Sequence, residues 1–330
     1  MKDNGFTLIE LLAVIVILAI IFSIVTISVG KTINDSEKKL STTQKNIIEH
    51  AAEMYYIEEG RNNKIACVSL NTLIDKGYLK ANQVKDPQTK EIMDGSVKIT
   101  IDGKKYSYEY KDDSCIICTK VETSTTGNVP TGSFNYGDEY TCDVGDGENK
   151  TFFVLENNTD TVSLIMYANI GVDGKAITSS STNKSLVAWI SKADYVAAGG
   201  TESDYGSYGN NNKGPITVTK ALKEYTTTWA KLLSSKITLP STTQIAIASG
   251  KTFNGVDSIE DLPTWLNDYL QDKTHSVPEV LGYWTSTPNA DNSDLAWIVH
   301  CNGLMANYFV GVETRHGIRP VITISKSDIQ

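Results

Sequence analysis

The chain has 330 residues, a formal net charge of −9, 40% hydrophobic residues and 21% charged residues. This length allows two ordinary domains, each with its own core, and the composition is that of a folded rather than a disordered protein. The acidic balance and the lack of an evident basic patch argue against a nucleic-acid-binding surface. Five cysteines are too few, and odd in number, for a disulfide-rich scaffold.

The N-terminal region contains an apolar stretch of 24 residues, 6–29, with a single charge at Glu10. As a helix it would be about 36 Å long, enough to cross a hydrocarbon core of about 30 Å. A secretory signal peptide needs a basic leader and a cleavage site of small residues, but here the leader is MKDNG and no such site follows. A plain anchor does not explain Glu10 either, because a carboxylate in lipid is costly and usually marks function.

Gly5 followed by FTLIELLAVIVILAII resembles the class III signal of type IV pilins and pseudopilins. The resemblance implies that a prepilin peptidase removes leader 1–5 and methylates the new N-terminus, Phe6. It also implies residence in the cytoplasmic membrane, followed by assembly with other pilin subunits into an extracellular pilus. Glu10 is then the fifth residue of the mature chain. We expect its carboxylate to meet the Phe6 amine of a neighbouring subunit, because an unpaired charge there costs about 3 kcal/mol and a well-placed pair much less.

After Gly30 the sequence becomes amphipathic, with apolar residues near helical spacing, until Gly60 and the following Arg-Asn-Asn give a stop signal. We therefore expect one long helix over 6–59. Its segment 6–30 would lie in the membrane or the filament core, and its second half would pack on a head domain. Many Gram-negative pilins have a kinking proline where this chain has Ile27, so we expect a smoother helix or a bend near Gly30.

The head domain is expected over residues 31–118, as an α+β pilin fold in which the long helix packs on a small antiparallel sheet. The segment VSLNTLIDKGYLK predicts a short helix that ends at Gly77, and SVKITIDGKKYSYEY predicts a hairpin with its turn at Asp102-Gly103. This stretch resembles the short heads of Gram-positive, especially clostridial, pilins. We interpret a tyrosine stripe on the second strand as a half-buried face, with a ligand platform as the alternative. The stripe consists of Tyr106, Tyr108 and Tyr110.

Cys115 and Cys118 form a C-x-x-C at the end of this domain, Cys67 precedes them by about fifty residues, and Cys142 follows them across the expected linker. They could hold a structural zinc ion that clamps the two globular domains together. They could equally form disulfides in an exported protein, for example Cys67 with Cys115 and Cys118 with Cys142, or remain free thiols. A redox motif would need a βαβ context, which is not evident around this C-x-x-C.

Residues 119–132, rich in Thr, Gly and Pro, predict a linker. Residues 133–330 hold 14 Lys and Arg against 22 Asp and Glu, and we expect them to form an accessory α+β domain with a twisted antiparallel sheet. Three strands are expected over 134–171, helices over 185–199 and 216–233, and four short alternating strands in the last fifty or so residues.

In the accessory domain, LPSTTQI, YWTST and GIRPVITIS resemble a module of bacterial surface and pilin-like proteins. Similar patterns occur in C-type-lectin-like and formylglycine-generating-enzyme-like domains. The residues that carry the resemblance are Leu239, Pro240, Tyr283, Trp284, Thr285, Ser286, Gly317, Arg319 and Pro320. The resemblance implies a fold and no activity, because the catalytic cysteine pair and the lectin calcium signature are missing. Trp265-Leu-Asn267-Asp268 is only superficially similar to that signature and lies on an expected helix.

Individual residues of this domain favour structural roles. We expect Arg319 to bind loop carbonyls or a carboxylate, and Trp284 and Trp297 to lie in the core. The oxygen ligands in 291–294 lack the Gly and distal Glu of an EF-hand, which makes calcium a minor alternative. The loop 205–212, with its tyrosines and asparagines, is typical of adhesive loops and of plain exposed loops alike.

The sequence gives no sign of an enzyme. None of the four histidines has an adjacent Ser or Cys in a recognisable nucleophile elbow, and there is no Gly-rich phosphate loop. The histidines are His50, His275, His300 and His316. Cys301 is interpreted as a buried strand cysteine with His300 on the opposite face.

Taken together, these patterns predict a minor type IV pilin of a Gram-positive bacterium that presents its accessory domain on the filament surface or tip. The bulk of that domain favours a minor over a major subunit. We expect adhesion to a host or cell-surface glycan or protein, no nucleic-acid partner, and no cofactor other than the zinc ion considered above. A pseudopilin of a secretion or DNA-uptake system, or a membrane-anchored ligand-binding surface protein, is the alternative.

Overall fold

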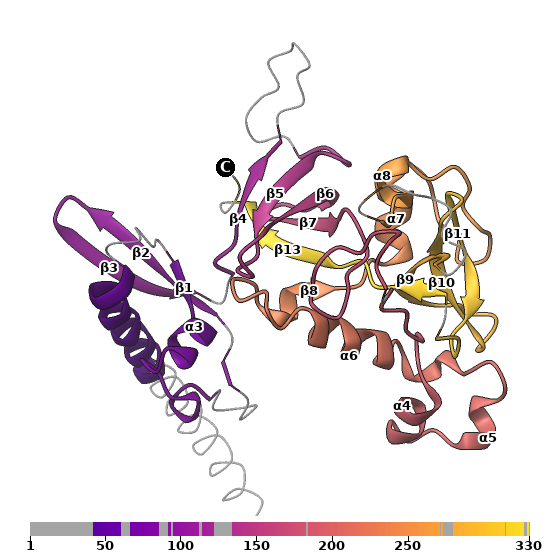
Figure 1. The fold of residues 1–330 in the computed structure, drawn as a ribbon, viewed down its shortest axis with the longest axis horizontal. Helices are drawn as coiled ribbons and strands as arrows, with labels where there is room; N and C mark the ends of the chain where they lie inside the picture. Colours follow the sequence, from indigo (N-terminus) through magenta and orange to yellow (C-terminus); the bar gives the residue numbers. More distant parts are fainter. Residues whose placement is uncertain are drawn as a thin grey trace, which may run out of the picture. The chain divides into compact units, whose positions relative to one another are not determined.

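The computed structural model describes residues 42–60, 67–85, 92–93, 95–111, 114–121, 134–182, 184–270, 272, 280–313, 315–326 and 329. Contacts between Cα atoms divide the chain into two compact units (Figure 1). The first unit comprises residues up to Met93 together with Val97–Lys111, and the second comprises Asp94–Ser96 together with Asp112–Gln330. The expected leader 1–5 and membrane segment 6–30 lie outside the described residues.

The first unit consists of a helix and a three-stranded sheet with the order β1-β2-β3. The helix is described from residue 42 and ends in a π-helical turn. The elements in chain order are helix 42–55, η1 (Tyr56–Gly60), β1 (Cys67–Ser69), α3 (Leu70–Asp75), η2 (Ala81–Gln83), β2 (Ser96–Asp102) and β3 (Lys105–Lys111).

Apolar residues at helical spacing explain how the helix joins the core of the first unit. Ile48, Ala51, Ala52 and Tyr55 are at most 7% exposed and belong to one cluster with residues of β1, β2 and α3. Strand β3 closes this core with its half-buried tyrosines. The tyrosine stripe is therefore a packing face, as predicted, and Tyr56 of the π-helical turn contacts two of its rings.

Two local predictions in the first unit are confirmed. Helix α3 begins at its N-cap Ser69, whose hydroxyl accepts a hydrogen bond from the Thr72 amide at 3.1 Å. It ends before Gly77, whose φ of +81° is the left-handed conformation typical of a helix stop. The hairpin β2–β3 turns at Gly103, with φ of +60°.

The second unit contains a six-stranded sheet with the order β4-β5-β6-β7-β13-β8 and a four-stranded sheet with the order β11-β10-β9-β12. The larger sheet consists of β4 (Ile117–Lys120), β5 (Glu139–Asp143), β6 (Asn149–Asn157), β7 (Thr161–Met166), β8 (Ile237–Thr238) and β13 (Val321–Ser325). The smaller consists of β9 (Gly282–Pro288), β10 (Leu295–His300), β11 (Leu304–Phe309) and β12 (His316–Gly317).

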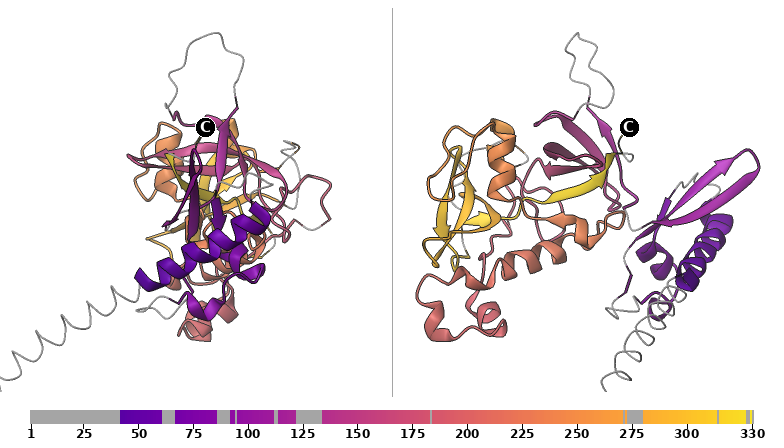
Figure 2. Two further views of the ribbon diagram at one scale, coloured as in Figure 1. Left: turned by 90° about the vertical axis from the view of Figure 1, so that its left-hand side faces the viewer. Right: turned by 180° about the vertical axis from the view of Figure 1, so that it is seen from behind.

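Short helices connect and cover these sheets: α4 (Lys192–Ala197), α5 (Glu202–Tyr205), η3 (Asn211–Lys213), α6 (Ile216–Tyr225), η4 (Ser234–Lys236), α7 (Thr242–Ala248) and α8 (Thr264–Asn267). Helix α7 contacts β6 of the larger sheet and β9 of the smaller one, so it lies where the two sheets meet (Figure 2). Trp284 and Trp297 are 0% and 1% exposed, which confirms their predicted place in the core.

The boundary between the units differs from the one expected at residue 118. Strand β4 pairs antiparallel with β5, from Ile117 opposite Asp143 to Lys120 opposite Tyr140. The C-x-x-C segment and the first residues of the expected linker 119–132 therefore belong to the second unit. A Thr-containing alternating segment has enough strand propensity to join an available sheet edge. Residues 122–133 lie outside the described part of the chain.

Two helices are shorter than predicted. The segment 185–199 is helical only over α4, because residues before Ser191 run along the smaller sheet, where the Val187 amide donates to the His316 carbonyl. The expected helix 216–233 ends at Tyr225, where three successive threonines begin. Threonine is a poor helix former, and the Thr226 hydroxyl bonds the Leu222 carbonyl at 2.8 Å.

Candidate functional site

The predicted processing and assembly residues, Gly5, Phe6 and Glu10, lie outside the described residues. Within the described ranges, which start at residue 42, no helix has the length and apolar character needed to cross a bilayer. The structure therefore bears on the cysteines and on the accessory domain.

The cysteines favour the disulfide alternative over zinc. Cys118 and Cys142 lie directly opposite each other on β4 and β5, with Cα atoms 4.2 Å apart, and form a disulfide. Cys67 and Cys115 are disulfide-bonded as well. A zinc site needs thiolates that such bonds remove, and no cluster of three or more His, Cys, Asp or Glu residues among those described is arranged to hold a metal ion.

Removing the Cys118–Cys142 disulfide should destabilise the second unit by about 3.5 kcal/mol, because the bond closes a loop with a sequence separation of 24. The measurement is denaturant unfolding of the Cys118→Ala/Cys142→Ala variant, followed by tryptophan fluorescence. Cys301→Ala, which removes a free thiol, is the matched control. A chelator that shifts the wild-type transition to the same extent would instead indicate zinc.

Several residues that carry the surface-module resemblance link β9 to neighbouring segments through hydrogen bonds. The Ser286 amide donates to the Pro240 carbonyl at 2.8 Å, and the Thr285 hydroxyl donates to the Trp297 carbonyl at 2.8 Å. The Trp284 indole donates to the Val187 carbonyl at 2.8 Å. These contacts satisfy buried polar groups.

Arg319 is fully buried and holds three segments together. Its Nε donates to the Met166 carbonyl at 2.6 Å, and its Nη1 and Nη2 donate at 2.6 Å to the Leu266 and Trp265 carbonyls. Burial lowers the pKa of the guanidinium, and the neighbouring Tyr283 opposes this shift. The predicted structural role, binding of backbone carbonyls, is confirmed, but these carbonyls belong to β7 and α8 rather than to loops.

His316 on β12 is a buried neutral histidine. It is 0% exposed, its ring lies 4.8 Å from that of Trp284 and 4.5 Å from that of Tyr308, and neither ring nitrogen has a hydrogen-bond partner among the described residues. Burial, with smaller contributions from His300 and Arg315, lowers its pKa to about 3. With no nucleophile bonded to it, the imidazole packs as an aromatic ring.

The second unit should lose stability as the pH falls below about 6.5, the pKa of an unfolded histidine. In this pH range His316 binds a proton in the unfolded chain but stays neutral in the folded chain, where its pKa is about 3. We expect a loss of about 2 kcal/mol between pH 7 and pH 5. Denaturant unfolding at both pH values should show this loss in the wild type and in the exposed-site control His50→Phe, but not in His316→Phe. Equal losses in all three proteins would contradict the assignment.

The tyrosine- and asparagine-rich loop 205–212 is held in place by buried contacts. The Tyr205 hydroxyl donates to the Ile190 carbonyl at 2.8 Å. The Asn211 side-chain amide donates to the carbonyls of Asn289, Asn292 and Leu295. Tyr208 is the exception, because it is 52% exposed and stacks on Phe309 with ring centroids 4.3 Å apart.

The segment 291–294, the minor calcium alternative, is built from turn hydrogen bonds, and Asn292 Oδ1 accepts one of them from the Asp294 amide at 2.9 Å. In the segment 291–294, the amides of Asp291 and Asn292 both donate to Asn289 Oδ1 at 2.9 Å. Such bonds are those of an Asx turn. Asn267 and Asp268 lie at the end of helix α8, as predicted.

The expectation that His300 and Cys301 face apart is wrong. Strand β10 ends at His300, and Cys301 begins the turn to β11, so strand alternation does not apply. The thiol lies 3.5 Å from His300 Nδ1. Burial nevertheless raises the pKa of the Cys301 thiol, which disfavours the nucleophilic thiolate.

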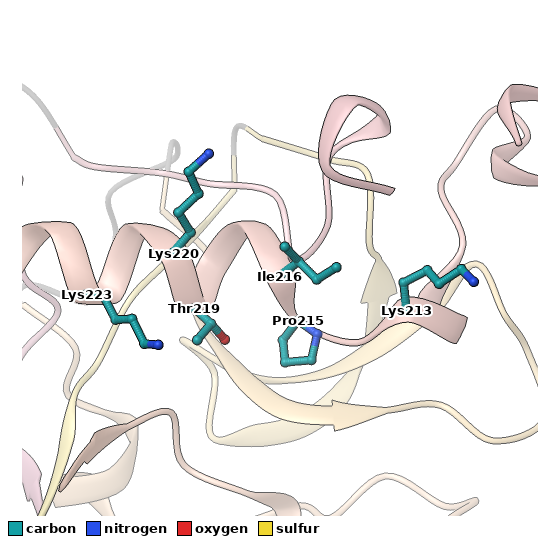
Figure 3. A pocket seen from close by; sticks show the side chains of 6 residues that line it. All are labelled: Lys213, Pro215, Ile216, Thr219, Lys220 and Lys223. Atoms are coloured by element: carbon teal, nitrogen blue, oxygen red, sulfur yellow. The ribbon is translucent and has the colours of Figure 1, made fainter. Parts of the chain in front are cut away.

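One surface feature was missed by sequence reasoning, which found no basic patch. Six residues of η3 and α6 line an open groove of about 460 Å³: Lys213, Pro215, Ile216, Thr219, Lys220 and Lys223. Figure 3 shows Pro215 and Thr219 between Lys213 and Lys223. The signal was available, because residues 205–223 contain three lysines and no Asp or Glu.

Comparisons with known proteins bear on the N-terminus. Residues 1–26 match the family model described as the prokaryotic N-terminal methylation motif. The comparisons with curated proteins and with solved structures found no match. The motif indicates a type IV pilin-like or pseudopilin-like prepilin, which is anchored in the membrane before a prepilin peptidase processes it and it assembles with other pilins.

Proposed function

We propose that the chain is a minor subunit of a Gram-positive type IV pilus that presents residues 133–330 for adhesion. The observation that carries this proposal is the N-terminal methylation motif at residues 1–26. Cleavage after Gly5 and methylation of Phe6 produce a mature chain that enters the filament through its N-terminal helix.

The architecture of the second unit supports a role in display. It has its own cores, built by two sheets and the helices around them, and disulfide-bonded cysteines that suit an exported protein. Two of its buried polar groups are used in packing: Arg319 binds carbonyls and His316 is enclosed by rings. We therefore propose a binding rather than a catalytic role.

The size of the second unit also supports the proposal of a minor rather than a major subunit. It contains more than half of the chain, and every copy in a filament needs space for it at the surface. Low copy number, or a position at the tip, avoids this crowding. A pseudopilin of a secretion or DNA-uptake system shares the same processing signal and is the second candidate.

The test is mass spectrometry of filaments sheared from the cell surface. We expect peptides of this chain at much lower abundance than the major pilin, with an N-terminal peptide that begins at methylated Phe6. Immunogold labelling of the second unit should decorate the filaments sparsely or at their tips. A chain that is absent from sheared filaments but processed in the membrane fraction would point to a pseudopilin. A chain that keeps its first five residues would overturn both candidates.

A further inference from the structure

We propose that the groove along η3 and α6, defined by the six residues above, binds an acidic peptide segment of a partner protein that also carries apolar side chains. This inference deepens the proposed adhesive function by naming the chemistry of the partner. It concerns a surface of the second unit alone and does not depend on whether the chain enters a filament.

Charge is the first argument. The accessory domain has 14 basic and 22 acidic residues, yet three of its lysines lie in this one groove. Lys213 and Lys223 have no carboxylate within ion-pair distance among the described residues, and Lys220 has only a long contact of 3.7 Å with Asp194. An anionic ligand could therefore pair with the ammonium groups of this groove, whereas the net negative charge of the protein disfavours its binding at other surfaces.

The floor of the groove distinguishes a peptide from a sugar. Pro215 and Ile216 supply apolar surface between the lysines, whose own methylene stems add more. Thr219 provides the only side-chain hydroxyl of the lining. A polysaccharide would lose water from many hydroxyls with few partners to replace it, whereas apolar side chains beside carboxylates satisfy both parts of the groove.

Lysine, rather than arginine, also fits such a ligand. An ammonium on a flexible stem acts as a point charge and accepts carboxylates over a range of positions, without the fixed fork geometry of a guanidinium. Helix α6 fixes the spacing of Lys220 and Lys223, and the short η3 helix places Lys213 before its N-terminus. The groove is therefore suited to a segment with several carboxylates rather than to one anion.

The test is fluorescence anisotropy on the full-length mature chain in detergent micelles. The probe is a labelled dodecapeptide of Glu-Leu-Glu-Ser repeats, and two matched peptides replace every Glu by Gln or every Leu by Ser. We expect the first peptide to bind, with an affinity that falls as ionic strength rises, and both matched peptides to bind at least several-fold more weakly.

Variants of the groove locate the site. Lys213→Gln/Lys220→Gln/Lys223→Gln should weaken binding about tenfold, because each exposed ion pair contributes about a factor of two to three. The matched control removes the same charge at three lysines outside the groove: Lys104, Lys236 and Lys251.

Three outcomes would overturn the proposal. These are no binding of the Glu-Leu-Glu-Ser peptide, equal weakening by the control triple variant, and equal binding of the Ser-for-Leu peptide. Displacement of the probe by polygalacturonate at equal carboxylate concentration would assign the groove to acidic polysaccharides instead. Because no filament is involved, each outcome is independent of the test of pilus assembly.

Discussion

Replacing Glu10 by alanine should reduce incorporation of this chain into filaments about a hundredfold. In the proposed assembly, the carboxylate meets the Phe6 amine of a neighbouring subunit in a low-dielectric environment. Without Glu10 that ammonium is left unpaired, at a cost of about 3 kcal/mol, which corresponds to about two powers of ten in an equilibrium. Glu10 is the single charged residue of the stretch 6–29, so in the proposed assembly its pair with the Phe6 amine is the contact that would fix the register between subunits.

The measurement is the ratio of this chain in sheared filaments to the chain in the membrane, by quantitative mass spectrometry. Glu10→Gln keeps the size and polarity of the side chain but not its charge, and should fail nearly as badly as alanine. Glu37→Ala, outside the apolar stretch, is the control and should assemble normally. Normal incorporation of Glu10→Ala would refute the pairing, and a failure to cleave after Gly5 would show that the substitution acts on processing instead.

Features set by neighbouring residues were predicted well. Asp102-Gly103 between alternating runs gave the hairpin, and the strand-like alternation around Trp284 and Trp297 placed both side chains in the core. In each case a turn residue or a period of two is sufficient information. The methylation motif is likewise a feature of neighbouring residues, because a peptidase recognises a short contiguous segment.

Features set by distant residues were not predictable in detail. Arg319 was expected to bind carbonyls, but its acceptors lie as far away as Met166, 153 residues earlier in the chain. The boundary at residue 118 failed because β4 finds its partner in β5, across the expected linker. The lysine groove is a local feature, and the run of lysines without Asp or Glu over 205–223 indicates a basic segment. That run alone does not show that Lys213 and Lys223 line one surface, because this depends on where α6 begins.

Arg319→Ala should destabilise the second unit by about 5 kcal/mol. The variant removes the donors to the carbonyls of Met166 and Trp265, and each buried carbonyl left unsatisfied costs about 1–3 kcal/mol. Leu266 is less affected, because its carbonyl also accepts from the Tyr283 hydroxyl at 2.7 Å. The cavity left by a fully buried side chain adds to the loss.

All five tryptophans, from Trp189 to Trp297, lie in the second unit, so their fluorescence during denaturant unfolding reports on this unit alone. Arg319→Lys should lose about 3 kcal/mol, because one ammonium cannot reach carbonyls from two separate segments in the geometry of the guanidinium fork. The exposed neighbour Arg315→Ala is the matched control for charge and should change stability by less than about 1 kcal/mol. If Arg319→Lys were as stable as the wild type, the charge of Arg319 rather than its hydrogen bonds to three carbonyls would hold these segments, and the role assigned to those bonds would be wrong.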